Sequence, residues 1–200
     1  MKSNHFRLWG VLFSALMLGL QYLPLQAQDA ASVAYNNGQA AFEKGDLDTA
    51  IADTSQAIAL EPNVPLGYES RGFMREMKGD LDGAIAEFRE ALRLDPNYGP
   101  AHFNLGLTLL RDSKTKAGRE MIGKHWENVV AEFGEATRLQ PNNDVAHYEL
   151  GWVLEMRGER DRAFNEYRIA YTLKPDNATY EKAYKDFKKR NRTVIPIPIP

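Results

Sequence analysis

Glycine and proline recur along this chain in a fixed register, and this periodicity restricts its fold more than any other feature. The glycines are spaced by 34, 34 and 45 residues: Gly38, Gly72, Gly106 and Gly151. The prolines are spaced by 34, 45 and 34 residues: Pro62, Pro96, Pro141 and Pro175. A period of this length is typical of arrays in which each unit is one supersecondary motif that buries its apolar face only by stacking on its neighbours.

Each unit predicts two helices. The first is seen in Leu66–Lys78 and Val145–Arg157, which carry apolar residues at helical spacing and stop at Gly79 and Gly158, residues suited to the left-handed position past a helix end. The second helix is expected to begin after an N-capping aspartate, which would be Asp48, Asp82 or Asp161. It is expected to end before each proline, at Leu60, Leu94, Leu139 and Leu173.

Columns of small and aromatic residues keep the same register between these landmarks. The small columns hold Ala50, Ala84, Val129 and Ala163, and Ala57, Ala91, Ala136 and Ala170. The aromatic column holds Thr54, Phe88, Phe133 and Tyr167. We expect Gly38 and Ala50 to let paired helices approach closely, and the large rings to fill the remaining space.

The 34-residue period and these columns resemble the tetratricopeptide repeat (TPR) family over residues 31–177. The resemblance implies an all-α, helix-turn-helix solenoid, a right-handed superhelix of four repeats with a C-terminal capping helix. The expected boundaries are repeats at 31–64, 65–98, 99–143 and 144–177, the capping helix at 178–192 and an extended Pro-rich tail at 193–200. The first repeat should be the loosest, because Thr54 stands in its aromatic column and Ala34 stands where Tyr68, His102 and His147 follow.

In TPR proteins the first helices line a concave groove that binds peptides, and the resemblance places fourteen residues of this chain there. They are Tyr35, Gln39, Phe42, Glu69, Phe73, Glu76, Met77, Phe103, Leu107, Arg111, Tyr148, Trp152, Glu155 and Met156. This set is rich in aromatic residues and methionine, as a partner site would be; the alternative is that some of them pack on a neighbouring helix. The Lys and Asn clamp of chaperone-binding TPR proteins is absent, because the matching positions hold Tyr35, Gln39, Ser70 and Pro100, with only Asn104 agreeing.

The N-terminal segment predicts a secretory signal peptide, residues 1–27. Lys2 and Arg7 precede the apolar run Leu8–Leu20, and a short polar stretch leads to a cleavage site after Ala27. The alternative is an uncleaved membrane anchor, although 13 apolar residues span only about 20 Å of a hydrocarbon core of roughly 30 Å. We therefore expect an exported protein, periplasmic or extracellular and most simply bacterial.

The third repeat carries eleven extra residues within Ser113–Trp126. Eleven residues are about three helical turns, which keeps the helix faces in phase. One interpretation is a second helix that starts near Lys116 and exposes Met121 and Ile122 as a second contact surface. The other is a Lys-rich polar loop containing Gly118 and Gly123.

Nothing in the sequence predicts catalysis, a metal site or a cofactor. The chain has no cysteine, and its His102, His125 and His147 do not fall at metal-binding spacing. His102 and His147 occupy equivalent positions, which suggests either a stacked pair that acts as a pH sensor or weak metal site or, as we favour, two half-buried rings in the column of Tyr68. A net charge of −2 gives no indication of nucleic-acid binding.

The C-terminal region is cationic from Lys182 to Arg192 and ends in the alternating run Ile195–Pro200. The cations are interpreted as the solvated face of a capping helix, or alternatively as a contact for anionic lipid or polymer. The tail is expected to be extended and polyproline-like.

The sequence therefore predicts an exported protein-protein interaction scaffold or adaptor that binds a peptide or protein partner and is not an enzyme. The alternative is a membrane-held accessory subunit or assembly chaperone for an envelope enzyme or secretion complex.

Overall fold

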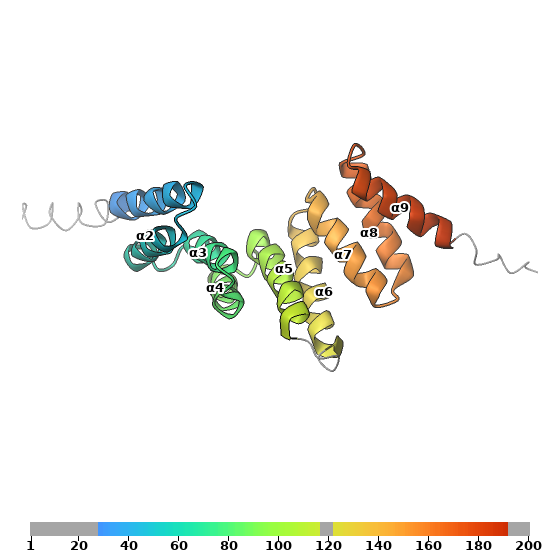
Figure 1. Cartoon of the computed structure of the whole chain (residues 1–200), viewed down its shortest axis with the longest axis horizontal. Helices are drawn as coiled ribbons and strands as arrows, with labels where there is room; N and C mark the ends of the chain where they lie inside the picture. Colours follow the sequence, from blue (N-terminus) through green and yellow to red (C-terminus); the bar gives the residue numbers. More distant parts are fainter. Residues whose placement is uncertain (1–27, 117–121, 192–200) are drawn as a thin grey trace, which may run out of the picture.

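The computed structural model describes residues 28–116 and 122–191, and in this part of the chain all regular structure is helical (Figure 1). Residues 28–43 form the first helix. It is followed by α2 (Leu47–Leu60), α3 (Pro65–Met77), α4 (Leu81–Leu94), α5 (Gly99–Lys116), α6 (Ile122–Leu139), α7 (Asp144–Met156), α8 (Arg160–Leu173) and α9 (Ala178–Asn191). The predicted all-α solenoid of helical hairpins is confirmed.

The helices stack in chain order. Within hairpins, α3 packs on α4, α5 on α6 and α7 on α8; between hairpins, α2 meets α3, α4 meets α5 and α6 meets α7. Helix α9 packs on α8 at the end of the array. The helix of residues 28–43 and α9 therefore lie at opposite ends of an elongated molecule (Figure 1).

Left-handed glycines turn the chain between the two helices of a hairpin. Gly45, Gly79 and Gly158 have φ of 79°, 85° and 80°, a conformation that side chains with a Cβ rarely adopt. The left-handed turns predicted at Gly79 and Gly158 are thus confirmed.

The predicted N-caps are wrong by two residues. Asp46 and Asp80 cap α2 and α4, accepting hydrogen bonds from the amides of Thr49 (3.1 Å) and Gly83 (2.9 Å), and Glu159 makes no side-chain cap of α8. The left-handed glycine reverses the chain within a single residue, so the next helix starts only two residues later. The three aspartates named from the sequence, Asp48, Asp82 and Asp161, consequently lie in the first turn of their helices.

The C-terminal ends of the second helices are as predicted, at Leu60, Leu94, Leu139 and Leu173. In each hairpin from α3 to α8, the conserved register brings a glycine of the first helix against an aromatic ring of the second. A Cβ built on Gly72 would lie 2.8 Å from Phe88, and one on Gly106 would lie 2.9 Å from Phe133. Gly151 meets Tyr167 in the same way at 2.9 Å.

The first hairpin has a smaller core of its own. Gly38 approaches Thr54, which stands in the aromatic column, and the Thr54 hydroxyl donates to the sulfur of the buried Met74 at 3.6 Å. The hydrophobic core at this end is a small cluster of Ala41, Ala50 and Met74. The rest of the array shares one continuous core whose residues run from Ala84 to Phe187. This division supports the expectation that the first repeat is the loosest.

The eleven extra residues of the third repeat lengthen both helices of the hairpin. Helix α5 extends to Lys116, and α6, described from Ile122, has 18 residues like α5, against 13 in α3 and 14 in α4. The prediction that the second helix starts near Lys116 is wrong, since Lys116 belongs to the first helix. Met121 lies outside the described residues, and Ile122 is described in its backbone alone.

The predicted signal peptide and the predicted extended tail lie outside the described residues, which begin at 28 and end at 191. Of the helices described, none combines the length and the apolar character needed to span a bilayer.

Candidate functional site

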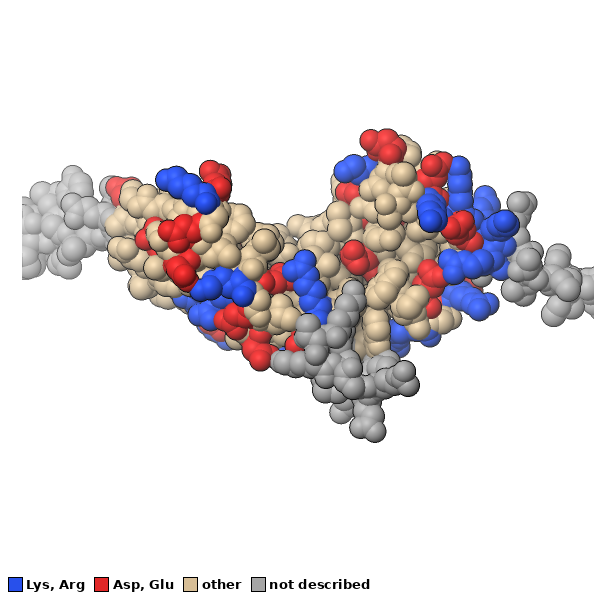
Figure 2. Space-filling model, viewed as in Figure 1, with Lys and Arg blue, Asp and Glu red and all other residues tan. Residues whose placement is uncertain are grey.

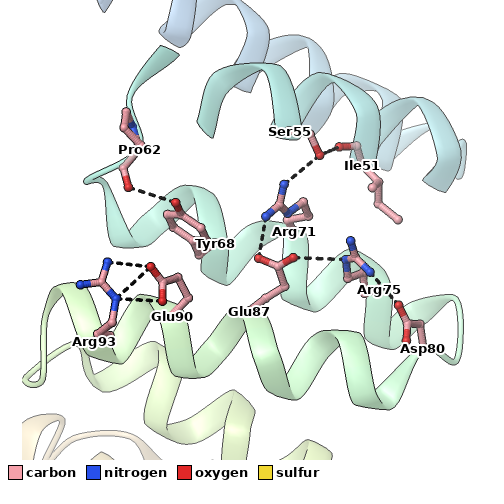
Figure 3. Close-up of polar contacts among 10 residues, drawn as sticks. All are labelled: Ile51, Ser55, Pro62, Tyr68, Arg71, Arg75, Asp80, Glu87, Glu90 and Arg93. Atoms are coloured by element: carbon pink, nitrogen blue, oxygen red, sulfur yellow. Dashed lines mark hydrogen bonds and ion pairs between the residues drawn. The ribbon is translucent and has the colours of Figure 1, made fainter. Parts of the chain in front are cut away.

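A polar network on one side of helix α3 connects it to α2 and α4 (Figure 3). The Arg71 guanidinium donates to Ser55 of α2 (3.0 Å) and to Glu87 of α4 (2.8 Å). Arg75 approaches the same Glu87 (3.3 Å) and bonds Asp80 (2.9 Å). Because Arg71 and Glu87 are largely buried, this ion pair is shielded from solvent and holds the rotation of α3 about its axis.

The opposite side of α3 forms an open hollow with the helix of residues 28–43. Its volume is about 240 Å³, and it is lined by Tyr35, Gln39, Phe42, Leu66, Glu69, Ser70, Phe73 and Met74. Five of these lining residues belong to the groove set inferred from the sequence: Tyr35, Gln39, Phe42, Glu69 and Phe73. The structure therefore brings the N-terminal part of that set together around one cavity, which we call the α3 hollow.

Aromatic rings and exposed apolar side chains shape the α3 hollow. The rings of Phe42 and Phe73 lie 5.6 Å apart at a tilt of 59°. Phe73 remains 38% exposed, and Leu66 and Met77 on the same side of α3 are also exposed. Exposed apolar residues grouped in this way, rather than scattered singly, mark a surface suited to a partner.

Leu66, Ser70 and Met74 were missed as site residues in the sequence. The signal was the helical spacing of α3, because positions 66, 70, 73 and 77 fall on one side of a helix. A second hollow of about 270 Å³ shares Tyr35 and Leu66 with the first and continues toward the C-terminal end of α2.

Hydrogen bonds set the orientation of the polar groups at the α3 hollow. The Gln39 amide donates to the Tyr35 hydroxyl (2.8 Å), and the Tyr35 hydroxyl bonds the Ser70 hydroxyl (3.0 Å). The Asn104 amide donates to Glu69 (2.6 Å). Burial raises the pKa of the Glu69 carboxyl, and the hydrogen bonds from Ser70 and Asn104 oppose this effect.

Three of these bonds connect successive first helices at the same separation of 35 residues. They are Tyr35 to Ser70, Glu69 to Asn104 and Glu76 to Arg111, the last at 2.6 Å. Burial raises the pKa of the Glu76 carboxyl and the positive charge of Arg111 lowers it. The first two bonds join the same pair of repeat positions, and the third joins a pair seven residues further along the helices. Together they tie residues 28–43, α3 and α5 into one wall.

The C-terminal part of the predicted groove set is packed rather than open. Tyr148 stacks on Tyr180 of α9, with ring centroids 5.0 Å apart, and Trp152 packs on Trp126 at 6.0 Å. Phe103 and Leu107 pack against the main core. Burial raises the pKa of the Tyr148 and Tyr180 hydroxyls, in agreement with their enclosure between α7 and α9.

Glu155 is also engaged within the molecule, since it accepts from the Tyr167 hydroxyl (2.8 Å) and pairs with Arg190 of α9 (2.7 Å). Met156, Met77 and Arg111 remain exposed. The groove set thus divides into an open N-terminal part and a C-terminal part that α9 and the core largely cover.

The two equivalent histidines contact neighbouring oxygen atoms in the same way. His102 lies 2.7 Å from Glu132 and 3.0 Å from the carbonyl of Pro96, and His147 lies 2.6 Å from Glu166 and 3.1 Å from the carbonyl of Pro141. Tyr68 donates to the carbonyl of Pro62 (3.0 Å) from the equivalent position. These rings therefore fasten a loop to a helix. Among the described residues, no group of three or more acidic or histidine side chains could hold a metal ion.

The stacked hairpins and the open side of α3 define the class of this protein as an α-helical repeat solenoid. Within it, residues 77–113 match the model of the TPR repeat family. A comparison with curated proteins finds no match.

Solved structures share the fold. MamA (residues 41 to the end) from Desulfovibrio magneticus RS-1 aligns with a TM-score of 0.68 and 20% identity, over 82% of this chain and 86% of that one. YrrB, described as a TPR protein with an unusual peptide-binding site, aligns with a TM-score of 0.64 and 18% identity, over 80% of this chain and 76% of that one. The first TPR of Spaghetti (RPAP3), bound to an HSP90 peptide, aligns with a TM-score of 0.58 and 20% identity, over 66% of this chain and 98% of that one. Together with the repeat match, these likenesses support a tetratricopeptide repeat protein, and they indicate no catalytic family.

Proposed function

We propose that this chain is an exported TPR scaffold of four repeats, cleaved after Ala27, that binds a peptide segment of a partner protein at the α3 hollow. The observation that carries the proposal is the open, aromatic-lined cavity between residues 28–43 and α3, with Phe73 exposed at its edge. The peptide-binding site described for YrrB and the HSP90 peptide bound by the RPAP3 domain support a peptide ligand for this chain.

The chemistry of the hollow favours a peptide ligand that inserts one apolar side chain and makes polar contacts through the backbone on either side of it. Its walls are Phe42, Leu66 and Phe73, while Gln39 and Glu69 supply hydrogen-bonding groups at its rim. A cavity of about 240 Å³ is smaller than the usual pocket for a cofactor or drug-sized ligand. An extended peptide that inserts one side chain and runs along α3 toward Met77 would use the exposed surface fully.

Peptide display against the purified protein, followed by affinity measurement of the selected peptides, tests this site. Phe73→Ala should weaken binding at least about tenfold, or about 1.4 kcal/mol, because the largest exposed wall of the hollow is removed. Met156→Ala is the matched control, since Met156 is an exposed apolar residue of a first helix outside the hollow. Equal loss of affinity in both variants, or none in either, would contradict the site.

Export is tested separately. The chain recovered from the cell envelope or medium should begin at Gln28 by N-terminal sequencing and mass spectrometry. Recovery of the intact N-terminus in the membrane fraction would instead favour the membrane-held accessory subunit.

A further inference from the structure

The charged residues of this chain are sorted between its two ends. Residues 28–64, the first hairpin with its following loop, have one cation, Lys44. Their carboxylates are Asp29, Glu43, Asp46, Asp48, Asp53 and Glu61. Four of these, Asp29, Glu43, Asp46 and Asp48, are exposed, and of the four only Asp48 pairs with a cation among the described residues, Lys78 of α3. We call this end the acidic pole.

The other end, formed by α8 and α9, is cationic. Its nine Lys and Arg side chains are all exposed: Arg160, Arg162, Arg168, Lys174, Lys182, Lys185, Lys188, Lys189 and Arg190. They outnumber the five carboxylates of the same helices and their loop: Asp161, Glu166, Asp176, Glu181 and Asp186. Figure 2 shows blue atoms gathered at this end, which we call the basic pole.

Much of the positive charge at the basic pole is not neutralised locally. Lys185 pairs with Glu181, Arg162 with Glu159 and Arg190 with Glu155. Six cations form no ion pair with any residue that the structure describes: Arg160, Arg168, Lys174, Lys182, Lys188 and Lys189. This charge exceeds what the carboxylates of α8 and α9 can balance.

The two poles cannot neutralise each other within one molecule. The helices α3 to α7 lie between them (Figure 1), and each helix layer is roughly 10 Å thick. Salt screens exposed charges beyond about 8 Å at physiological ionic strength. The complementary surfaces are therefore available only to another molecule.

We propose that copies of this protein associate head to tail, with the basic pole of one copy seated on the acidic pole of the next. The acidic pole offers more than charge, because a hollow of about 320 Å³ is lined there by Asp29, Ala30, Val33, Ala34, Asn37 and Gln56, and Val33 is 58% exposed. The aliphatic stems of the α9 lysines can cover such a surface while their ammonium groups reach the carboxylates around it. An interface of this kind uses two different surfaces of the same chain, so it leaves a free pole at each end and permits chains or rings.

The head-to-tail interaction does not use the residues that line the α3 hollow. Both sites include the helix of residues 28–43, but no residue lines both hollows. The head-to-tail interaction predicts a strong dependence of association on salt, because the attraction between the poles is screened as ionic strength rises.

The test measures the mass of the chain by sedimentation velocity, on protein purified in the form that its native cell produces. The measurement is made at about 20 mM and at about 500 mM salt, between which screening differs severalfold. We expect multiples of the monomer mass at low salt and monomer at high salt. Lys182→Glu with Lys189→Glu, or Asp29→Lys with Glu43→Lys, should each give monomer at low salt. Mixing the two double variants should restore association, because each then meets a pole of opposite sign.

The control is Arg89→Glu with Arg138→Glu, which makes the same change in net charge at exposed sites between the poles and should leave association intact. A wild-type chain that is monomeric at low salt would overturn the proposal, as would association that survives the pole variants. Binding of the monomer to vesicles containing anionic lipid, abolished by Lys182→Glu with Lys189→Glu, would assign the basic pole to a membrane surface instead.

Discussion

At the scale of single residues, the contact between a glycine of one helix and a ring of the next determines how closely each hairpin packs. Phe133 is fully buried, and its ring occupies the space that a Cβ on Gly106 would need. The ring has no room to move aside, because neighbouring core residues surround it. The glycine is therefore required by packing, since Gly106 is helical and has an ordinary φ.

Gly106→Ala should lower the free energy of unfolding by about 1–3 kcal/mol, the usual cost of overpacking a core. Gly134→Ala is the matched control on the partner helix α6, because no atom of the described chain lies within 4 Å of a Cβ built there. That change should raise stability by about 0.5–1 kcal/mol, since alanine favours helix over glycine. Urea unfolding of both variants measures the two effects, and an equal gain in stability in both would show that Gly106 matters only for helix propensity.

At the scale of elements, α9 is an integral part of the fold. Its apolar side is buried through Tyr180 and Phe187, and the Phe187 ring lies 5.7 Å from that of Tyr167. Its other side carries the exposed lysines. One helix thus closes the core and supplies a solvated surface, as the terminal helix of a repeat array must.

Phe187→Ala should destabilise the protein by about 3–5 kcal/mol, because a buried aromatic side chain is lost from the main core. Lys189→Ala, two residues along the same helix and exposed, should change stability by no more than about 0.5 kcal/mol. Chemical denaturation distinguishes the two. A negligible effect of Phe187→Ala would mean that α9 is detached from the array in solution.

At the scale of the whole molecule, stability is divided unevenly along the array. The main core joins α4 to α9, whereas the first hairpin depends on the small cluster around Ala50 and Met74. Repeat arrays are stabilised by contacts between neighbours, so a weakly packed end can unfold before the rest.

We therefore expect unfolding to depart from a single two-state transition. Trp126 and Trp152 both pack on the main core, so in a Trp9→Phe chain tryptophan fluorescence reports on that core alone, while circular dichroism reports on all helices. The circular dichroism signal should begin to fall at a lower urea concentration than the fluorescence signal. Coincident transitions would show that the first hairpin is as stable as the others.

Much of the fold and part of the site could be predicted because their causes are local. Proline ends a helix through its missing amide, and Gly79 and Gly158 permit a left-handed turn. The N-caps were placed wrongly because two aspartates, such as Asp46 and Asp48, compete within one turn, and the sequence alone does not decide between them.

The sequence by itself determined the period, the helix ends, the glycine and aromatic columns and thereby the all-α solenoid, since each rests on conformational preferences within a few residues or on a repeated spacing. Only the tertiary structure decided that the insertion lengthens both α5 and α6, that α9 covers Tyr148 while Phe73 stays open, and that the acidic and basic poles lie at opposite ends of the array. These outcomes depend on which side chains a neighbouring hairpin brings from more than thirty residues away, and the repeat pattern is the same whether a first-helix residue is covered or exposed.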